Sequence, residues 1–214
     1  MRTLVLCDDY YHPARTPRAG LAPLAARGLA FDWVEHADAW PAESMRDYPA
    51  VILTKMNEVS AADRRPWASE ATGAAFLEYV RQGHGLLVIH SGSAGYEQVP
   101  ALRRLMGGAF NRHPPQCPVT VDPRAGHQLA AGAEPFTLVD EHYFMDLDDD
   151  RTDVFLTTVS EHGTQPGGWT RGEGAGRVCV LTPGHNVEVW LDPSYQAILE
   201  NALRWVAGQL AEKP

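Results

Sequence analysis

Short apolar runs recur along the chain, and polar loops follow them. Runs of this length between turn residues are typical of buried strands, because a strand covered on both faces is apolar throughout. In the first half we predict four strands, at Thr3–Cys7, Phe31–Glu35, Ala50–Thr54 and Leu86–Ile89. The second half adds four strand-like runs, at Val119–Val121, Phe136–Val139, Val154–Thr158 and Arg177–Leu181.

Longer segments with a helical spacing of apolar residues lie between and after these strands. The clearest is Pro193–Gly208, where apolar side chains recur every three or four residues and should dock the helix on the core. They are Tyr195, Ile198, Leu199, Ala202 and Trp205. Further helices are predicted at Pro17–Gly28, Thr72–Gln82 and Pro100–Met106.

The order of these elements predicts an α/β fold with a mainly parallel sheet covered by helices on both faces. The sequence shows no repeat and no linker, so we expect a single domain over residues 1–214. Two glycine-rich segments, Gly167-Gly168 and Gly172–Gly176, are not followed by Gly-Lys-Ser/Thr and do not open a helix. They therefore predict the flanks of a β-hairpin and not a phosphate-binding loop.

Charge and cysteine content exclude several classes of function. The formal net charge is −9 and the Lys and Arg residues form no cluster, so nucleic acid is not expected as a partner. The three widely spaced cysteines, Cys7, Cys117 and Cys179, predict buried free thiols in a reducing compartment. No apolar stretch approaches the roughly 18 residues of a membrane span, and the N-terminal run is too short for a signal peptide. We expect a cytoplasmic protein without a membrane partner.

Residues that can bind metals or transfer protons follow many of the apolar runs. In an open α/β sheet, ligands collect at the carboxyl ends of the strands. If the strands are parallel neighbours, the residues that follow them converge on one crevice. The residues concerned are His12, His90, His113, Glu141 and His185.

Imidazoles and a carboxylate around one crevice have two chemical uses. They could bind Zn²⁺ or another divalent metal, with His12, His90, His113 and His185 as the candidate ligands. They could instead act without a metal as general acid and base, because imidazole titrates near neutral pH. No His-x-x-x-His or Cys-x-x-Cys spacing decides between these uses, and a histidine taken alone is more often a structural or surface residue.

Ser91 follows a predicted strand, as a nucleophilic serine would. The surrounding sequence, Ile89-His90-Ser91-Gly92-Ser93, lacks the first glycine of the Gly-x-Ser-x-Gly nucleophile elbow. A serine hydrolase is therefore disfavoured, and Ser91 is expected in a turn or in substrate binding.

Several short motifs become specific when their order is considered. They are Tyr11-His12, Gly83-x-Gly85 leading to His90-Ser91, Gly107-Gly108-x-Phe110 with His113-Pro114, Asp140-Glu141-x-Tyr143, and Gly174-x-Gly176-Arg177-Val178 leading to Gly184-His185 and Trp190. In these motifs the chain resembles the ThuA-like family, named for trehalose utilisation, of the class I glutamine amidotransferase-like superfold.

This resemblance implies a flavodoxin-like three-layer α/β/α sandwich and a role in sugar metabolism, particularly with disaccharides and their keto derivatives. It also implies that His90-Ser91 stands where an amidotransferase carries its cysteine nucleophile. No cysteine lies between Cys7 and Cys117, so glutamine hydrolysis through a thiolate is not expected. His142 departs from the family motif, which often has leucine between the acidic pair and the tyrosine.

The expected function is therefore action on a sugar or keto-sugar by proton abstraction, followed by elimination or isomerisation, with a metal such as Zn²⁺ as an optional aid. His90 or Glu141 would be the base. His113, His185 or the metal would stabilise the enolate or protonate the leaving oxygen. The candidate substrate-binding residues are His12, Tyr11, Ser91, Tyr143 and Trp190, the aromatic ones as platforms for sugar faces.

Two further expectations concern binding partners. The alternative function is a non-catalytic module that binds a small ligand such as a sugar, or acts as a scaffold, because one superfold hosts many functions. Trp40 and Trp67 are candidates for exposed residues at the interface of a homo-oligomer.

Overall fold

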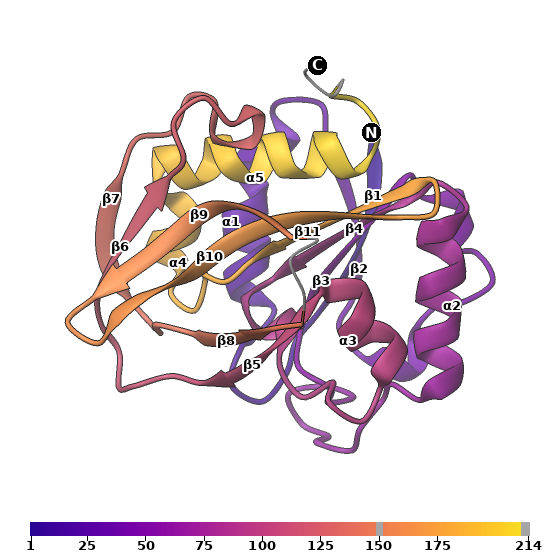
Figure 1. The fold of residues 1–214 in the computed structure, drawn as a ribbon. Helices are drawn as coiled ribbons and strands as arrows, with labels where there is room; N and C mark the ends of the chain where they lie inside the picture. The colour runs from indigo at the N-terminus through magenta and orange to yellow at the C-terminus, as the bar shows by residue number, and fades with distance from the viewer. Residues whose placement is uncertain (149–151, 211–214) are drawn as a thin grey trace.

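The computed structural model describes residues 1–148 and 152–210, and its centre is a nine-stranded sheet (Figure 1). The strand order is β2-β1-β3-β4-β11-β10-β9-β6-β7. The strands are β1 (Arg2–Cys7), β2 (Ala30–Val34), β3 (Ala50–Thr54), β4 (Gly85–Ile89), β6 (Cys117–Pro123), β7 (Phe136–Asp140), β9 (Asp153–Ser160), β10 (Gly163–Glu173) and β11 (Gly176–Leu181). A separate antiparallel pair, β5 (Gly108–Arg112) and β8 (Phe144–Leu147), lies below the main sheet in this view.

The sheet is mixed and mainly parallel. Strands β2, β1, β3, β4 and β11 are parallel neighbours. The remaining pairs, from β11 to β7, are antiparallel. Because direction alternates across these four pairs, β9 and β7 run the same way as β4, and only β6 and β10 oppose it. The carboxyl end of β7 therefore points to the same edge of the sheet as those of β1, β4 and β11.

Helices cover both faces of the sheet, as the sequence predicts (Figure 1). Alternation along β1 shows why: Val5 and Cys7 belong to one apolar cluster, and Leu4 and Leu6 belong to the other. The first cluster includes α1 (Arg15–Ala25), α4 (Val187–Leu191) and α5 (Pro193–Val206), and the second includes α2 (Glu70–Arg81) and α3 (Pro100–Met106). Four short 3₁₀ helices complete the described elements: η1 (Ala37–Ala39), η2 (Met45–Asp47), η3 (His90–Ser93) and η4 (Gln128–Ala130).

The predicted α/β fold is confirmed, with differences at element boundaries. Helix α2 begins before the predicted Thr72, because Ser69 accepts the Thr72 N–H in a capping box. Strands β5, β8 and β10 were not predicted. Their sequences carry little apolar alternation, and β10 is rich in glycine. The predicted hairpin is confirmed between β10 and β11, but Gly167-Gly168 lies inside β10 at an irregularity in the pairing, not beside the turn.

The cysteines and tryptophans show how well exposure was predicted. All three cysteines are buried free thiols, as predicted, and burial raises the pKa of Cys7 to about 12. Trp40 and Trp67 are half-buried and not exposed: their rings are 5.7 Å apart, and Trp40 stacks on Phe76. They therefore belong to the edge of the core, and their predicted exposure is wrong.

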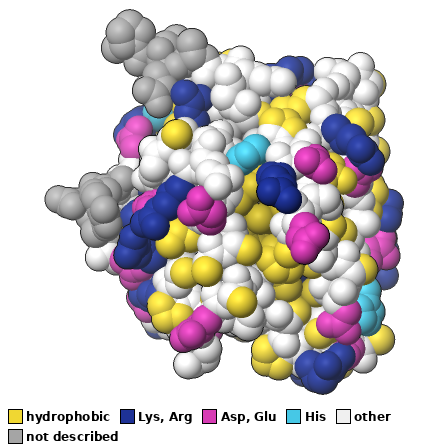
Figure 2. Space-filling view, turned by 90° about the vertical axis from the view of Figure 1, so that its right-hand side faces the viewer, with side chains coloured by type: hydrophobic (Ala, Val, Ile, Leu, Met, Phe, Trp, Pro, Cys, Tyr) yellow, Lys and Arg dark blue, Asp and Glu magenta, His cyan; other side chains and the backbone are white. Residues whose placement is uncertain are grey.

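The face on the right of Figure 1 mixes apolar and charged side chains (Figure 2). A hollow of about 240 Å³ beside α2 is lined by Met45, Ala75 and Tyr79 together with Glu43, Arg46 and Glu78. The described residues that line this hollow include no histidine. Among the described residues, no helix combines the length and apolar composition that a membrane crossing requires.

Candidate metal centre

A strained turn places His90 at the carboxyl edge of the sheet. His90 directly follows β4 and begins η3 with φ of 48°, a conformation that costs a non-glycine residue about 1–3 kcal/mol. Two residues later, Gly92 lets η3 pack on the end of β3, because a Cβ there would overlap the carbonyl oxygen of Leu53. The turn fixes the imidazole in the interior, where His90 is only 1% exposed. Strain that persists in a fold suggests a functional position.

Four histidines surround the carboxylate of Glu141, which follows β7. The His185 Nδ1 atom lies 3.1 Å from Oε1 of Glu141. The Nε2 atoms of His90, His113 and His12 lie 3.4, 3.7 and 4.0 Å from Oε2 of Glu141. The predicted convergence of these residues is therefore present, because the loops after β1, β4, β7 and β11 meet at one edge.

Four of these groups are close enough to share one metal ion. We call His12, His90, Glu141 and His185 the four-residue cluster; one ligand atom from each lies within 4.8 Å of all the others. The predicted ligand set had His113 in place of Glu141. In the structure, His113 lies outside the cluster, and its side chain is 36% exposed.

Three imidazole nitrogens of the cluster are buried without a hydrogen bond: His12 Nε2, His90 Nε2 and His185 Nδ1. Buried polar atoms normally have a hydrogen-bond partner. Three such nitrogens without one, all close to the same carboxylate, therefore require an explanation. The opposite nitrogens of two of these rings are fixed by acceptors. His12 Nδ1 donates to Asp9 Oδ1 at 2.7 Å, and His90 Nδ1 donates to the Thr182 carbonyl at 2.8 Å. These partners leave each Nε2 free to bind a ligand.

Charge is balanced tightly inside the cluster. Burial alone would raise the pKa of Glu141, but the adjacent imidazoles of His12, His185 and His90 hold it well below its usual range. Burial opposes protonation of His12 also, yet Asp9 and Glu141 raise its pKa to about 9. Burial lowers the pKa of His90. The fixed carboxylates thus favour a positive charge between these rings, which a proton on His12 or a metal cation could supply.

Two buried aspartates hold the loops in place. Asp9 accepts backbone N–H groups from Tyr11, His12 and Met56 at 2.9–3.0 Å. Asp140 accepts the N–H groups of Gly184 and His185 at 2.8 and 2.9 Å. The sequence motifs include Asp140, but sequence reasoning missed Asp9 as a site residue. The signal for Asp9 was an aspartate two residues before Tyr11 in the loop after a buried strand, which is typical of a side chain that caps its own loop.

A hollow of about 340 Å³ opens beside the cluster. Tyr143, at 3% exposure, stacks on His90 with ring centroids 4.1 Å apart. Tyr11, at 53% exposure, forms part of the rim. The lining residues are Tyr11, His12, Met56, Ala94, Phe110, His113, Glu141 and Tyr143.

The sequence matches one protein family over nearly all of its length. The family model for ThuA, described as trehalose utilisation, matches residues 4–206. The chain belongs to the ThuA family. This confirms the resemblance drawn from the sequence motifs. No curated protein matches the chain.

Solved structures share the fold of this ThuA chain at low sequence identity. A ThuA-like protein from Parabacteroides merdae has 18% identity and a TM-score of 0.77, covering 100% of this chain and 92% of that one. A cytoplasmic protein from Salmonella typhimurium LT2 has 14% identity and a TM-score of 0.68, covering 96% and 99%. A cold-adapted β-galactosidase from Rahnella sp. R3 has 14% identity and a TM-score of 0.68, covering 94% of this chain and 31% of that one. These likenesses show a common fold, consistent with the amidotransferase-like superfold.

Two residues predicted to bind substrate lie elsewhere in the ThuA chain. Trp190 is 1% exposed, packs against Gly20 and donates its indole N–H to the Gly184 carbonyl at 2.7 Å. The structure corrects its predicted role, because a buried ring has no open face for a sugar; Trp190 supports the loop that carries His185. Ser91 is also fully buried and does not line the hollow, although its Oγ has no hydrogen-bond partner.

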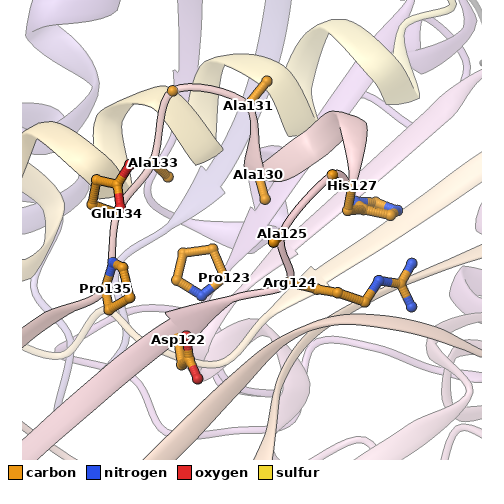
Figure 3. A pocket seen from close by; sticks show the side chains of 12 residues that line it. Asp122, Pro123, Arg124, Ala125, His127, Ala130, Ala131, Ala133, Glu134 and Pro135 are labelled. Atoms are coloured by element: carbon orange, nitrogen blue, oxygen red, sulfur yellow. The ribbon is translucent and has the colours of Figure 1, made fainter.

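A larger hollow, of about 530 Å³, lies away from the cluster between the loop after β6 and the segment before β7 (Figure 3). The side chains of Arg124 and His127 lie on one side of it and Glu134 lies on the other. Arg124 pairs with Asp153 at 2.7 Å, and His127 accepts the Leu129 N–H at 3.2 Å. Its lining is mostly alanine, proline and glycine, so this hollow has size without converging reactive groups.

Proposed function

We propose that this ThuA protein binds a divalent cation such as Zn²⁺ at the four-residue cluster and acts on a sugar or keto-sugar held in the adjoining hollow. The observation that carries the proposal is the convergence on one carboxylate of three buried imidazole nitrogens that have no hydrogen-bond partner. The family description, trehalose utilisation, supports a sugar as the ligand.

The donor set fits zinc in kind, and its spacing is somewhat wider than that of a zinc site. Imidazole nitrogen and carboxylate oxygen are common zinc ligands at about 2.0–2.2 Å, so neighbouring ligand atoms of a tetrahedral site lie roughly 3.3 Å apart. His185 Nδ1 lies 3.1 Å from Glu141 Oε1, and His90 Nε2 and His12 Nε2 lie 3.4 and 4.0 Å from Glu141 Oε2. One ligand atom from each of the four residues lies within 4.8 Å of the others, so the side chains would close in slightly around an ion. Asp9 and the Thr182 carbonyl supply the outer hydrogen bonds that orient metal-binding histidines.

A cation in the cluster would polarise a carbonyl or hydroxyl oxygen of the sugar. His113 is then the best placed group for proton transfer, since it lies at the hollow outside the cluster. Its Nδ1 donates to the Pro114 carbonyl at 2.7 Å, which leaves Nε2 facing the site. We infer that His113 Nε2 takes the proton from the carbon beside the sugar carbonyl. Isomerisation follows if the hydroxyl proton on the deprotonated carbon passes to the enolate oxygen and His113 returns its proton to the former carbonyl carbon. Elimination follows if the enolate expels an oxygen from the next carbon and His113 gives its proton to that departing oxygen.

The hollow favours an uncharged ligand. Among the described residues that line it, none is Lys or Arg, while Phe110, Tyr143 and Tyr11 offer aromatic surface. A sugar without a phosphate group therefore suits it best.

The proposal also includes a single domain over residues 1–214 and a cytoplasmic location. The first is supported by β11 pairing with β4 across the two halves of the chain, and the second by the description of the Salmonella relative.

Metal analysis of the purified protein tests the cation site. We expect about one equivalent of zinc, or of another divalent metal, in the wild type. His90→Ala/His185→Ala should lose it, because two of the four ligands are removed. The matched control His36→Ala/His162→Ala changes two histidines outside the cluster and should retain the metal. Equal metal content in all three proteins would contradict the assignment.

A turnover assay separates an enzyme from the alternative of a sugar-binding module. The metal-loaded wild type is incubated with a 3-keto-glucoside, and the products are followed by NMR. We expect turnover that His113→Gln lowers at least about 100-fold, as is typical on loss of a general acid or base. Sugar binding without turnover in the wild type would instead favour the non-catalytic module.

A further inference from the structure

Two adjacent tyrosines extend the rim of the hollow outward. Tyr10 and Tyr11 are 55% and 53% exposed, an unusual placement for large aromatic side chains in consecutive positions. Their rings meet edge to face with centroids 4.9 Å apart. Tyr11 lines the hollow beside the cluster, and Tyr10 does not. The pair therefore forms a continuous aromatic surface that begins inside the hollow and ends outside it.

Arg64 and Glu58 contact the two tyrosines and hold this surface in place. The guanidinium carbon of Arg64 lies 4.7 Å from the ring centroid of Tyr10 and 5.3 Å from that of Tyr11. Glu58, whose side chain is 7% exposed, accepts from Arg64 Nε at 2.8 Å and from the Tyr10 N–H at 3.0 Å. The backbone of Tyr11 is tied to Asp9. A buried carboxylate thus fixes both the cation and the loop, so the exposed rings are preorganised.

The family description already implies a disaccharide; we propose that Tyr10, Tyr11 and Arg64 form the outer subsite that holds its second sugar unit. This inference rests on the proposed function. One unit occupies the hollow at the four-residue cluster, and the next leaves the hollow across Tyr11 and stacks on Tyr10. The C–H face of a pyranose suits an aromatic ring, and its hydroxyls suit the phenol and guanidinium groups beside it. Glu58 is a positioning residue, which acts through Arg64 and the Tyr10 backbone.

The test compares one-unit and two-unit sugars on the zinc-loaded protein. Dissociation constants are measured by calorimetry or NMR titration for trehalose and maltose, and for methyl α-D-glucopyranoside as the one-unit probe. We expect Tyr10→Ala to weaken binding of both disaccharides by roughly 3- to 10-fold, the effect of losing one stacked ring. Binding of the methyl glucoside should change by less than about twofold. Tyr11→Ala should weaken all three sugars, because Tyr11 lines the inner hollow as well.

Two variants control for indirect effects. Tyr10→Phe keeps the ring and should keep most of the disaccharide affinity. Val159→Ala removes an exposed apolar side chain of β9, and it should change no binding constant. Zinc content and the unfolding midpoint of every variant are measured in the same preparations.

Each outcome decides the proposal. If the disaccharides bind the wild type and Tyr10→Ala leaves their affinity unchanged, or weakens the methyl glucoside equally, the outer subsite is wrong while the proposed function stands. If zinc is bound but neither these sugars nor the 3-keto-glucoside of the turnover assay binds the wild type, the sugar-binding function and the subsite are both wrong. Selective loss of disaccharide affinity supports the subsite.

Discussion

Histidine tautomers decide what the cluster can bind. His12 gives its Nδ1 hydrogen to Asp9, and His90 gives its Nδ1 hydrogen to the Thr182 carbonyl. In a neutral imidazole, the other nitrogen then carries a lone pair. Both Nε2 atoms face Glu141 in the buried interior, where a neutral ring offers its lone pair to a cation and a protonated ring donates to the carboxylate. At the scale of single residues, the site is therefore defined as much by the acceptors behind the rings as by the rings themselves.

Replacing the acceptor behind His12 should weaken metal binding without removing a ligand. The side chain of Asp9→Asn can donate an amide N–H to His12 Nδ1 as well as accept from it. The variant therefore no longer fixes the His12 tautomer in which Nδ1 carries the hydrogen. We expect zinc affinity to fall by about 10- to 100-fold, the usual cost of losing such an outer hydrogen bond. Competition with a chromophoric chelator at pH 7.5 measures it, with the surface variant Asp63→Asn as control. Unchanged affinity in a folded Asp9→Asn protein would refute the role of Asp9.

His127 provides a residue-scale prediction about stability and pH. Burial lowers its pKa, and its Nδ1 accepts the Leu129 N–H at the start of η4, which requires a neutral ring. The unfolded chain therefore binds more protons as pH falls below about 6.5. The contribution of neutral His127 is present above that pH and is lost as pH falls toward the lower, folded pKa.

His127→Asn keeps an acceptor for the Leu129 N–H but does not titrate. Between pH 7.5 and 5.0 its free energy of unfolding should fall less than that of the wild type. Urea denaturation at several pH values measures the difference, and His36→Asn, at an exposed histidine, serves as control. Parallel pH dependence in the wild type and His127→Asn would contradict the assignment.

At the scale of elements, each ligand of the cluster sits just beyond the end of a strand. Strands β1, β4, β7 and β11 run in one direction, so their following loops share an edge although β7 lies at the far end of the sheet order. The loop after β11 reaches Asp140 at the end of β7 through the N–H groups of Gly184 and His185. Close contacts between elements position these loops, and one such contact, beside His90, is where η3 packs on the end of β3 at Gly92.

Gly92→Ala tests that junction. The added Cβ would overlap the Leu53 carbonyl oxygen, so η3 must move away from β3. We expect a loss of about 1–3 kcal/mol in the free energy of unfolding, the usual cost of overpacking, and weaker zinc binding because His90 moves with η3. Gly172→Ala in β10 is the matched control, since no atom lies within 4 Å of the position that its Cβ would take. Equal unfolding free energies for the two variants would show that the junction tolerates a side chain.

At the scale of the whole molecule, the cluster links distant parts of the chain. His12 comes from the first loop and His185 from a loop after β11, so a bound cation would join segments far apart in sequence. A ligand that binds only the folded state stabilises it by mass action. This coupling makes unfolding a second, independent measure of the proposed site.

Zinc should raise the unfolding midpoint of metal-stripped protein. At a free zinc concentration of 100 times Kd, the expected gain is about 2.7 kcal/mol. Thermal unfolding with a chelator and with buffered zinc measures the shift. His90→Ala/His185→Ala should show none, whereas His36→Ala/His162→Ala should respond as the wild type does. A shift of equal size in both double variants would place the stabilising metal elsewhere.

Much of the architecture could be predicted because its causes are local. The apolar runs predicted strands β1, β3 and β4 with nearly the correct first and last residues. Helix α3 was predicted with its exact bounds, Pro100–Met106. Strand β10 was missed because its pairing comes from β9 and β11 on either side and not from its own glycine-rich sequence. Trp40 and Trp67 were wrongly predicted to be exposed for the same reason. Their burial depends on Phe76, which comes from a distant element, α2.

The sequence by itself determined the class of fold, the family and the set of residues from which a site could be built. Only the tertiary structure decided which of those residues meet: it grouped Glu141 with His12, His90 and His185, left His113 at the mouth of the hollow, and buried Trp190 beneath the loop. The physical reason is one of range. Strand and helix patterns act over a few residues, whereas ligand geometry depends on loop paths set by hydrogen bonds between distant segments, such as those of Asp9 and Asp140.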